Sequence, residues 1–293
     1  MRNSLLLANR LQLSLRSMDS AIILLLCGFL IGTLGTLIGA GGGFLLVPLL
    51  LFTHQGMSPE LVTAVSLVIV ACNAVSGSVA YARSGRIDYK AGLLFAAATI
   101  PGSILGVYAT KYIPAHAFNA VFGIILLVLA IFLFLKKSHT TITVEAAGLQ
   151  QKGYKHHILT DKENVRYSYF YNQYTGIVIS AAVGFLSPLL GIGGGIIHVP
   201  ALVHWLRFPV HIATATSHFI LAIMATVSVV VHACQGNYND PYIQHMIVWL
   251  GLGVIPGAQL GALLSHRIKG DMIVKALAIC LALVGLRLAS GSL

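Results

Sequence analysis

The sequence predicts an all-α integral membrane protein with about eight transmembrane segments in two homologous halves, each opening with a Gly-broken helix. The first observation is composition, since 57% of the 293 residues are hydrophobic and only 9% are charged. A soluble domain usually has about 25% charged residues, so this chain has too few to cover a water-facing surface. The second observation is that segments 20–59 and 167–206 contain no charged residue at all. Each exceeds the roughly 20 apolar residues that a helix needs to cross a bilayer.

Apolar runs between charged and turn residues predict the individual helices. In the first half the runs cover residues 20–52, 61–82, 91–112 and 117–135, and in the second half 174–206, 212–235, 242–266 and 272–288. The corresponding domains are an N-terminal arm 1–19, a first transmembrane repeat 20–135, a polar linker 136–172 and a second transmembrane repeat 173–293. The arm contains Arg2, Arg10 and Arg16 among leucines, which predicts an amphipathic segment on the membrane surface. An organelle transit peptide is the alternative.

An internal repeat is the most specific feature of the sequence. Residues 32–43, GTLGTLIGAGGG, align with residues 184–195, GFLSPLLGIGGG, without a gap. Further matches follow in the same order: Pro48 with Pro200, 63–66 (TAVS) with 214–217 (TATS), and 100–106 (IPGSILG) with 255–261 (IPGAQLG). Ordered matches of this kind predict an internal duplication. Duplicated halves with interrupted apolar segments at equivalent positions are typical of secondary transporters.

The first apolar run of each half is too long for one simple crossing at about 1.5 Å rise per residue, and it contains a glycine cluster and a proline. We therefore expect broken or re-entrant helices, whose freed backbone groups line a polar cavity or are buried in protein. The N–H groups at such a break favour an anion, because a helix N-terminus carries unpaired donors and the positive end of the helix dipole. The candidate substrate-binding glycines are Gly41, Gly42, Gly43, Gly193, Gly194 and Gly195. Tight helix packing through small residues is the alternative.

Hydroxyl groups early in the second helix of each half are further candidates for the substrate site. Ser66 and Ser217 occupy equivalent positions in the repeat, and Thr216 stands beside Ser217. Each hydroxyl can donate a hydrogen bond to an oxyanion while remaining cheap to bury. The alternative is a bond to a carbonyl group of its own helix, which Ser and Thr commonly make.

Histidines are the candidate titratable groups inside the membrane. His198 and His218 lie in apolar runs and are candidates for proton coupling, with neutral, hydrogen-bonded helix packing as the alternative. Asn73 and Gln259 are further polar candidates. No Asp, Glu, Lys or Arg lies deep in a predicted span, which argues against a cation carrier built on intramembrane carboxylates. The four cysteines form no short ligand spacing, so neither a metal nor a cofactor is predicted.

The net charge of +10 comes from basic residues in the connections between apolar runs, which positive-inside topology explains better than nucleic-acid binding. If each apolar run crosses once, the arm, the linker and the basic residues Arg83, Arg86 and Lys90 all lie on the cytoplasmic side. This count favours parallel halves. Inverted halves are the alternative, because Arg267 and Lys269 would face outward in the parallel arrangement.

The chain resembles the TauE/SafE family of sulfite exporters and related anion permeases. The resemblance rests on the paired Gly-x-Gly-Gly-Gly segments with a following proline, at 39–48 and 191–200, on Ala-Thr-Ser at 215–217, and on the paired Pro-Gly-x-x-x-Gly segments. It covers nearly all of the chain from about residue 20. The resemblance implies a multi-pass protein of the cell (plasma or inner) membrane that transports small sulfur-containing anions such as sulfite or organosulfonates. Val65 stands where the second half has Thr216, which puts an equal role of the halves in question.

Two other classes of protein compete with this interpretation. One is the permease subunit of a multi-component transporter, which needs a partner that the linker could contact. The other is a membrane-embedded enzyme, but the sequence has no nucleophile elbow, no HExxH helix and no buried carboxylate pair, so no enzyme is predicted. The expected partners are a small inorganic or organosulfur anion and the lipid bilayer, not nucleic acid. Homo-oligomerisation stays open.

Overall fold

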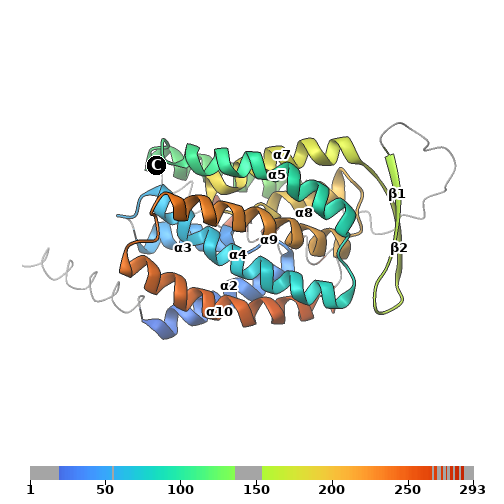
Figure 1. Cartoon of the computed structure of the whole chain (residues 1–293), viewed down its shortest axis with the longest axis horizontal. Helices are drawn as coiled ribbons and strands as arrows, with labels where there is room; N and C mark the ends of the chain where they lie inside the picture. The colour runs from blue at the N-terminus through green and yellow to red at the C-terminus, as the bar shows by residue number, and fades with distance from the viewer. Residues whose placement is uncertain are drawn as a thin grey trace, which may run out of the picture.

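The computed structural model describes residues 20–54, 56–135 and 154–265, together with single residues from 267 to 286. The described chain is a bundle of helices along one axis with a two-stranded hairpin across one end (Figure 1). The helices of the first half are α2 (Ala21–Ile38), α3 (Gly43–Thr53), α4 (Pro59–Ser84), α5 (Tyr89–Thr110) and α6 (Ala115–Leu135). The hairpin strands are β1 (Tyr154–Thr160) and β2 (Arg166–Asn172). The second half continues with α7 (Gln173–Leu190), α8 (Gly195–His204), α9 (Val210–Cys234) and α10 (Pro241–Ser265).

Among the described residues, 7 helices are long and apolar enough to cross a membrane, and α3 and α8 are shorter apolar helices. Large apolar side chains such as Ile22, Leu30 and Leu105 are 60–70% exposed on the outside of the bundle, where lipid takes the place of water. The prediction of a multi-pass helical membrane protein is confirmed. The arm 1–19 and most of the last predicted run, 272–288, lie outside the described residues.

Both predicted glycine breaks are present at the first helix of each half. α2 ends at Gly39 (φ 81°), and α3 begins after Gly42 (φ 82°). In the second half, α7 ends at Gly191 (φ 69°), and α8 begins after Gly194 (φ 78°). Glycine adopts positive φ without the steric cost that a Cβ brings, so the chain can change direction at these positions at little energetic cost. The expectation that each half opens with a Gly-broken helix is therefore confirmed.

The broken helix of the first half returns to the end of the bundle from which it came. Gly28 of α2 lies against Leu250 of α10, and one turn later Gly32 lies against Val254, so these helices run parallel. His54, just after α3, bonds through Nε2 to the hydroxyl group of Tyr242 (2.7 Å) at the start of α10. The start of α2 and the end of α3 therefore lie at the same end, opposite the hairpin (Figure 1).

The second half has the opposite orientation. α7 follows β2 directly, and Phe208, just after α8, packs on Tyr169 and Tyr171 of β2 with ring centroids 4.6 and 5.2 Å away. The α7–α8 pair thus enters from and returns to the hairpin end. The choice of parallel over inverted halves is wrong, because α2 and α7 start at opposite ends of the bundle. The prediction counted each broken run as one crossing of the membrane. Because the α2–α3 pair returns to the end from which it entered, only α4, α5 and α6 of the described helices cross before the second half begins. Three crossings place the start of the second half at the opposite end, so the halves are inverted.

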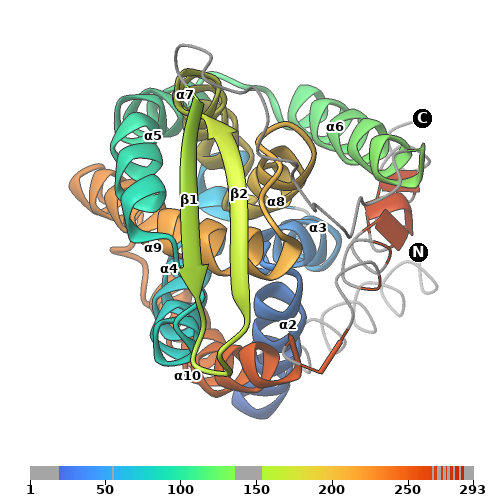
Figure 2. The same cartoon turned by 90° about the vertical axis from the view of Figure 1, so that its right-hand side faces the viewer.

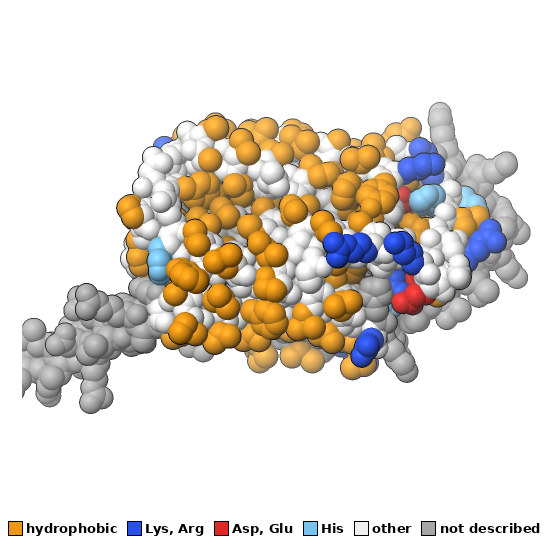
Figure 3. Space-filling view, turned by 60° about the horizontal axis from the view of Figure 1, so that its bottom comes forward, with side chains coloured by type: hydrophobic (Ala, Val, Ile, Leu, Met, Phe, Trp, Pro, Cys, Tyr) orange, Lys and Arg blue, Asp and Glu red, His pale blue; other side chains and the backbone are white. Residues whose placement is uncertain are grey.

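Basic side chains gather at the hairpin end of the bundle (Figure 3). Arg83, Arg86 and Lys90 flank the α4–α5 connection there, on the same side as the linker, as predicted. The Arg86 guanidinium group pairs with Asp161 in the hairpin turn (Nε–Oδ2 3.1 Å). α10 also ends on this side, so Arg267, which follows it, lies at the hairpin end with the other basic residues. Parallel halves would have placed it at the opposite end.

The third long helix of each half packs against the first helix of the other half. α10 packs along α2, and α5 packs along α7. The repeated Pro-Gly-x-x-x-Gly segments supply the contact surfaces. A Cβ on Gly102 would lie 2.7 Å from the carbonyl oxygen of Ala181, and one on Gly257 would overlap the backbone of Phe29. Small residues let the backbones approach this closely, which is how helices associate inside lipid.

Part of the predicted polar linker forms an antiparallel hairpin, which the sequence analysis did not predict. β1 pairs with β2 from Tyr154 opposite Asn172 to Thr160 opposite Arg166, and the hairpin lies across the end of the bundle (Figure 2). In β2, Tyr169 and Tyr171 turn inward and are buried. Alternating aromatic residues in β2 are the strand signal that was available in the sequence.

Candidate functional site

The two glycine breaks contact each other inside the bundle. Every residue from 38 to 44 and from 187 to 196 is buried. A Cβ on Gly43 would lie 2.5 Å from the carbonyl oxygen of Gly191, and one on Gly195 would overlap the carbonyl oxygen of Gly39. Only glycine lets two backbones approach this closely. The structure thus brings the two predicted glycine clusters, 41–43 and 193–195, into one place.

The short helices point their N-termini at this centre from opposite sides. α3 runs from its break toward the end away from the hairpin, and α8 runs from its break toward the hairpin end (Figure 1). Backbone N–H groups of Gly42 and Gly43 find no backbone acceptor in the described chain, and the same holds for Gly194 and Gly195. Unpaired donors at the positive ends of two helix dipoles favour an anion between them.

Each of the two predicted serines forms a hydrogen bond to the glycine break of the other half. The Ser66 hydroxyl group donates to the carbonyl oxygen of Gly191 (2.7 Å), and the Ser217 hydroxyl group donates to that of Gly39 (3.4 Å). Both serines are fully buried. Each therefore anchors the last residue before the break in the other half. The candidate hydroxyl groups lie at the breaks, but in this state they bond to the protein backbone.

A polar network flanks the first break. The Thr36 hydroxyl group donates to Oδ1 of Asn73 (2.6 Å) and lies 3.2 Å from Nε2 of His218. Because the hydroxyl proton is already used, Nε2 of His218 is the donor in the second contact. The Tyr81 hydroxyl group donates to the carbonyl oxygen of Thr36 (2.8 Å). The amide nitrogen Nδ2 of Asn73 is buried without a hydrogen-bond partner among the described residues, 3.5 Å from where Gly42 would carry a Cβ.

The second break has a different polar group in the equivalent place. The Ser187 hydroxyl group is buried without a hydrogen-bond partner among the described residues and lies 2.8 Å from where Gly194 would carry a Cβ. In the repeat, Ser187 aligns with Gly35, and Asn73 aligns with Met224. The unpaired polar group therefore comes from α4 of the first half, as Asn73, and from α7 of the second half, as Ser187. An unpaired buried polar group costs about 1–3 kcal/mol, and two such groups lie at the facing breaks.

Other predicted candidates lie away from the breaks. The Thr216 hydroxyl group accepts a hydrogen bond from the backbone N–H of Asp88 at the start of α5 (3.0 Å). His198 lies 3.2 Å from the Ser180 hydroxyl group, between α8 and α7. Gln259 donates to the backbone of α4 (2.7 Å). Of the two histidines considered for proton coupling, the structure places only His218 in the network at a break.

Sequence reasoning missed Thr36, Tyr81 and Ser187. The available signal was the difference between the repeats rather than their identity, since Thr36 and Ser187 stand where the other half has Pro188 and Gly35. Tyr81 gave no signal, because a tyrosine near the end of an apolar helix is usually an interfacial residue.

The described helices α2 to α10 carry charged residues only in their first or last turns. Inverted halves, two broken helices that meet inside the bundle, and unpaired donors at that meeting point together define a membrane transporter. The chain belongs to the TauE/SafE family, since the family described as "Sulfite exporter TauE/SafE" matches residues 24–288. It is a transporter and not an enzyme.

Curated relatives cover almost the whole chain. A protein of Bacillus subtilis (strain 168) called "Probable membrane transporter protein YunE" is 34% identical over 280 residues, which is 92% of this chain and 97% of the relative. "Probable membrane transporter protein MJ0441" of Methanocaldococcus jannaschii is 28% identical over 276 residues, 90% of this chain and 93% of the relative. No solved structure matches the chain. These names give membrane transport as the function and no substrate.

Proposed function

We propose that the protein is a secondary transporter of small anions, with sulfite, a sulfonate or another sulfur-containing oxyanion bound between the two Gly-broken helices. The observation that supports this is the meeting of two helix N-termini whose N–H groups have no acceptor, beside the unpaired Asn73 Nδ2 and Ser187 Oγ. All of these groups are hydrogen-bond donors. A cation would find no carboxylate here, whereas an oxyanion would find a donor for several of its oxygens.

The chemistry of the site suits a substrate that must also leave. Sulfite presents three oxygens around one charged centre, which converging N–H and O–H donors can share. A permanent cationic side chain would strengthen binding, but it would hold the anion in the bundle through a strong charge-assisted contact. Neutral donors and helix dipoles stabilise the anion more weakly, so that each step of transport stays reversible. For the proton coupling predicted at His198 and His218, the contact between His218 and Thr36 favours His218.

Transport by the purified chain alone tests this function. We expect liposomes containing only this protein to exchange labelled sulfite, and we expect unlabelled sulfonates to compete for that exchange. A permease subunit would transport only after its partner is added, and an enzyme would convert the anion instead of moving it. Liposomes that show neither exchange nor competition, although the protein in them is folded, would contradict the proposal.

The serines at the breaks give a prediction about affinity. In Ser66→Ala the buried carbonyl group of Gly191 loses its donor, which should cost about 1–3 kcal/mol of stability and weaken anion binding about tenfold to a hundredfold. Ser217→Ala should act in the same way on Gly39. Ser78→Ala is the matched control, because Ser78 is a buried serine of α4 whose hydroxyl group has no partner among the described residues. Thermal unfolding in detergent and equilibrium anion binding measure both effects. Affinity within twofold of the parent in both variants would remove these serines from the site.

A further inference from the structure

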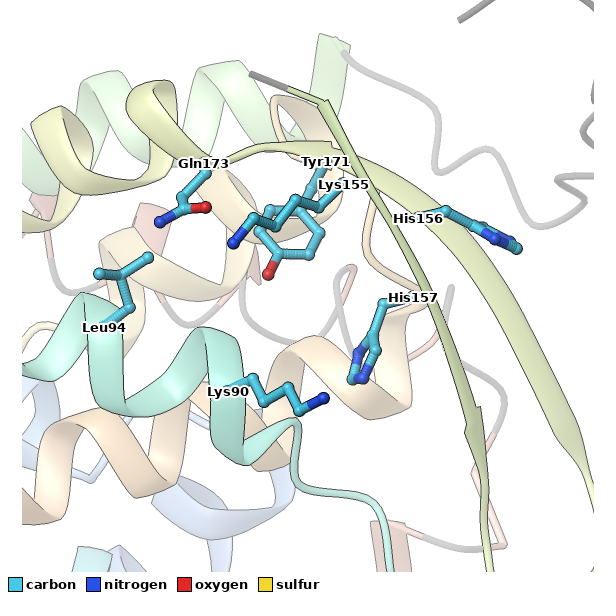
Figure 4. Close-up of a pocket in the computed structure, with 7 residues that line it drawn as sticks. All are labelled: Lys90, Leu94, Lys155, His156, His157, Tyr171 and Gln173. Atoms are coloured by element: carbon cyan, nitrogen blue, oxygen red, sulfur yellow. The ribbon is translucent and has the colours of Figure 1, made fainter. Parts of the chain in front are cut away.

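A polar cavity lies far from the glycine breaks, at the hairpin end of the bundle. It has a volume of about 400 Å³ and lies between β1, the start of α5 and the start of α7 (Figure 4). Its lining residues are Lys90, Leu94, Lys155, His156, His157, Tyr171 and Gln173. Figure 4 shows Lys90, Lys155, His157, Tyr171 and Gln173 around the hollow, while the ring of His156 points away from it.

The two lysines bring positive charge that no ion pair among the described residues takes up. No described acid lies within ion-pair distance of Lys90 or Lys155. The nearby carboxylate of Asp88 is fully buried and engaged by other groups. It accepts hydrogen bonds from Tyr169 (2.7 Å) and from the backbone N–H of Ala91 (3.1 Å), and its Oδ2 lies 2.6 Å from Nδ1 of His157. The lysine ammonium groups are therefore available to a ligand.

Neutral donors add to this charge. α5 and α7 run parallel and both begin beside the cavity, where the side chains of Asp88 and Asn172 cap their N-termini. Gln173 is the first residue of α7 and offers its amide group. Burial, with a further contribution from the charge of Asp88, raises the pKa of Tyr171 to about 12, so its hydroxyl group remains a donor at neutral pH.

The position of the cavity indicates where its ligand comes from. Tyr89 and Tyr174, at the starts of the same two helices, are 48% and 66% exposed on the outside of the bundle. Exposed tyrosines near helix ends mark the level of the lipid headgroups. The cavity therefore opens at the depth where both dissolved anions and the phosphate groups of lipids are found. Its volume exceeds what a bare sulfite needs and falls within the range of pockets for small ligands, about 300–1,000 Å³.

We propose that the cavity formed by Lys90, Lys155, Tyr171 and Gln173 binds a phosphate-type or sulfur-type oxyanion group, carried by a free anion or by a lipid headgroup, independently of the central transport site. The two lysines supply charge-assisted hydrogen bonds to the oxygens of the group. The hairpin forms one wall of the cavity through Lys155, so the bound anion bridges the hairpin and the bundle.

Binding in nanodiscs of defined lipid composition tests the proposal and separates the two sources. In the first arm, the full chain in phosphatidylcholine nanodiscs is titrated with inorganic phosphate. In the second, the nanodiscs contain a minor fraction of phosphatidylglycerol, and protein-bound phosphatidylglycerol is measured by native mass spectrometry. We expect K90Q/K155Q to weaken binding about tenfold to a hundredfold in one arm or both, through loss of charge-assisted hydrogen bonds. A loss in the first arm identifies a free anion, and a loss in the second identifies a headgroup.

The control is K162Q/R166Q, which removes two positive charges from the hairpin but outside the cavity lining. It should bind like the parent. An equal loss in the control would mean that diffuse surface charge attracts the anion, and it would overturn the site. Binding by K90Q/K155Q equal to that of the parent, or no binding by the parent in either arm, would overturn it as well. Because the readout is binding at the hairpin end, it is separate from the liposome exchange that tests transport.

Discussion

Gly194→Ala is expected to lower anion transport by the folded protein about a hundredfold, the usual cost of misplacing a reacting or binding group by about 1 Å. Gly194 has φ 78°, and a Cβ there would lie 2.8 Å from the Ser187 hydroxyl group and 3.1 Å from Cε of Met224. The added methyl group therefore occupies the space beside the unpaired donors of the second break. The left-handed conformation of an alanine costs only about 1–2 kcal/mol. We expect the protein to fold with reduced stability while transport is nearly lost.

Gly251→Ala is the matched control for this prediction. Gly251 lies inside α10, and a Cβ there would have no atom within 4 Å. The substitution adds the same methyl group to a helical glycine, so it should leave transport unchanged and stabilise the helix by about 0.5–1 kcal/mol. Sulfite exchange per folded protein, with the folded amount measured by size-exclusion chromatography, compares the two variants. Normal exchange by Gly194→Ala would show that the glycine breaks serve packing and not binding.

Asn73→Asp should abolish anion transport at neutral pH. The change replaces the unpaired Nδ2 donor with an acceptor oxygen and keeps the acceptor for the Thr36 hydroxyl group (2.6 Å). It also places a negative charge where we propose that the anion binds. Two like charges about 4 Å apart repel by about 4 kcal/mol at the effective dielectric of a protein, which corresponds to roughly a thousandfold loss of affinity. Anion exchange in liposomes and equilibrium binding measure the loss.

Two further variants make this prediction specific. Asn73→Leu has a similar size and no donor, so it should lose binding without the repulsion, about tenfold to a hundredfold. Asn119→Asp is the control, because Asn119 lies in α6, and its Oδ1 is also buried without a partner among the described residues. It should lower stability but leave exchange per folded protein unchanged. Equal losses in Asn73→Asp and Asn119→Asp would mean that any new carboxyl group in the bundle disturbs transport.

Inversion of the halves makes the two ends of the molecule different. The hairpin and its ion pair with Arg86 belong to one end, and the described chain has no hairpin at the other. The polar groups at the breaks differ as well, since α4 supplies Asn73 and α7 supplies Ser187. A bound anion therefore meets an amide group on one side and a hydroxyl group on the other. This asymmetry accords with the expectation that the halves do not play equal roles.

The sequence by itself determined the class of structure and the place of the breaks. Charge-free apolar runs have few solutions in lipid other than helices, because every backbone polar group must be paired within the segment. The glycine clusters needed positive φ, which the structure shows at Gly39, Gly42, Gly191 and Gly194. The repeat placed equivalent residues in order along the chain, so the candidates Ser66 and Ser217 were found together. Each of these features depends on local chemistry and spacing.

Only the tertiary structure decided the orientation of the halves and the partners of the site residues. A re-entrant helix and a crossing helix have the same apolar composition, so counting runs gave parallel halves where re-entry makes them inverted. Which donors remain unpaired is likewise a property of packing. Ser66 turned out to hold Gly191 across the repeat, whereas Asn73 and Ser187 were left without partners among the described residues. These contacts join residues more than 30 positions apart, and their geometry is set by how the helices pack, which no local pattern encodes.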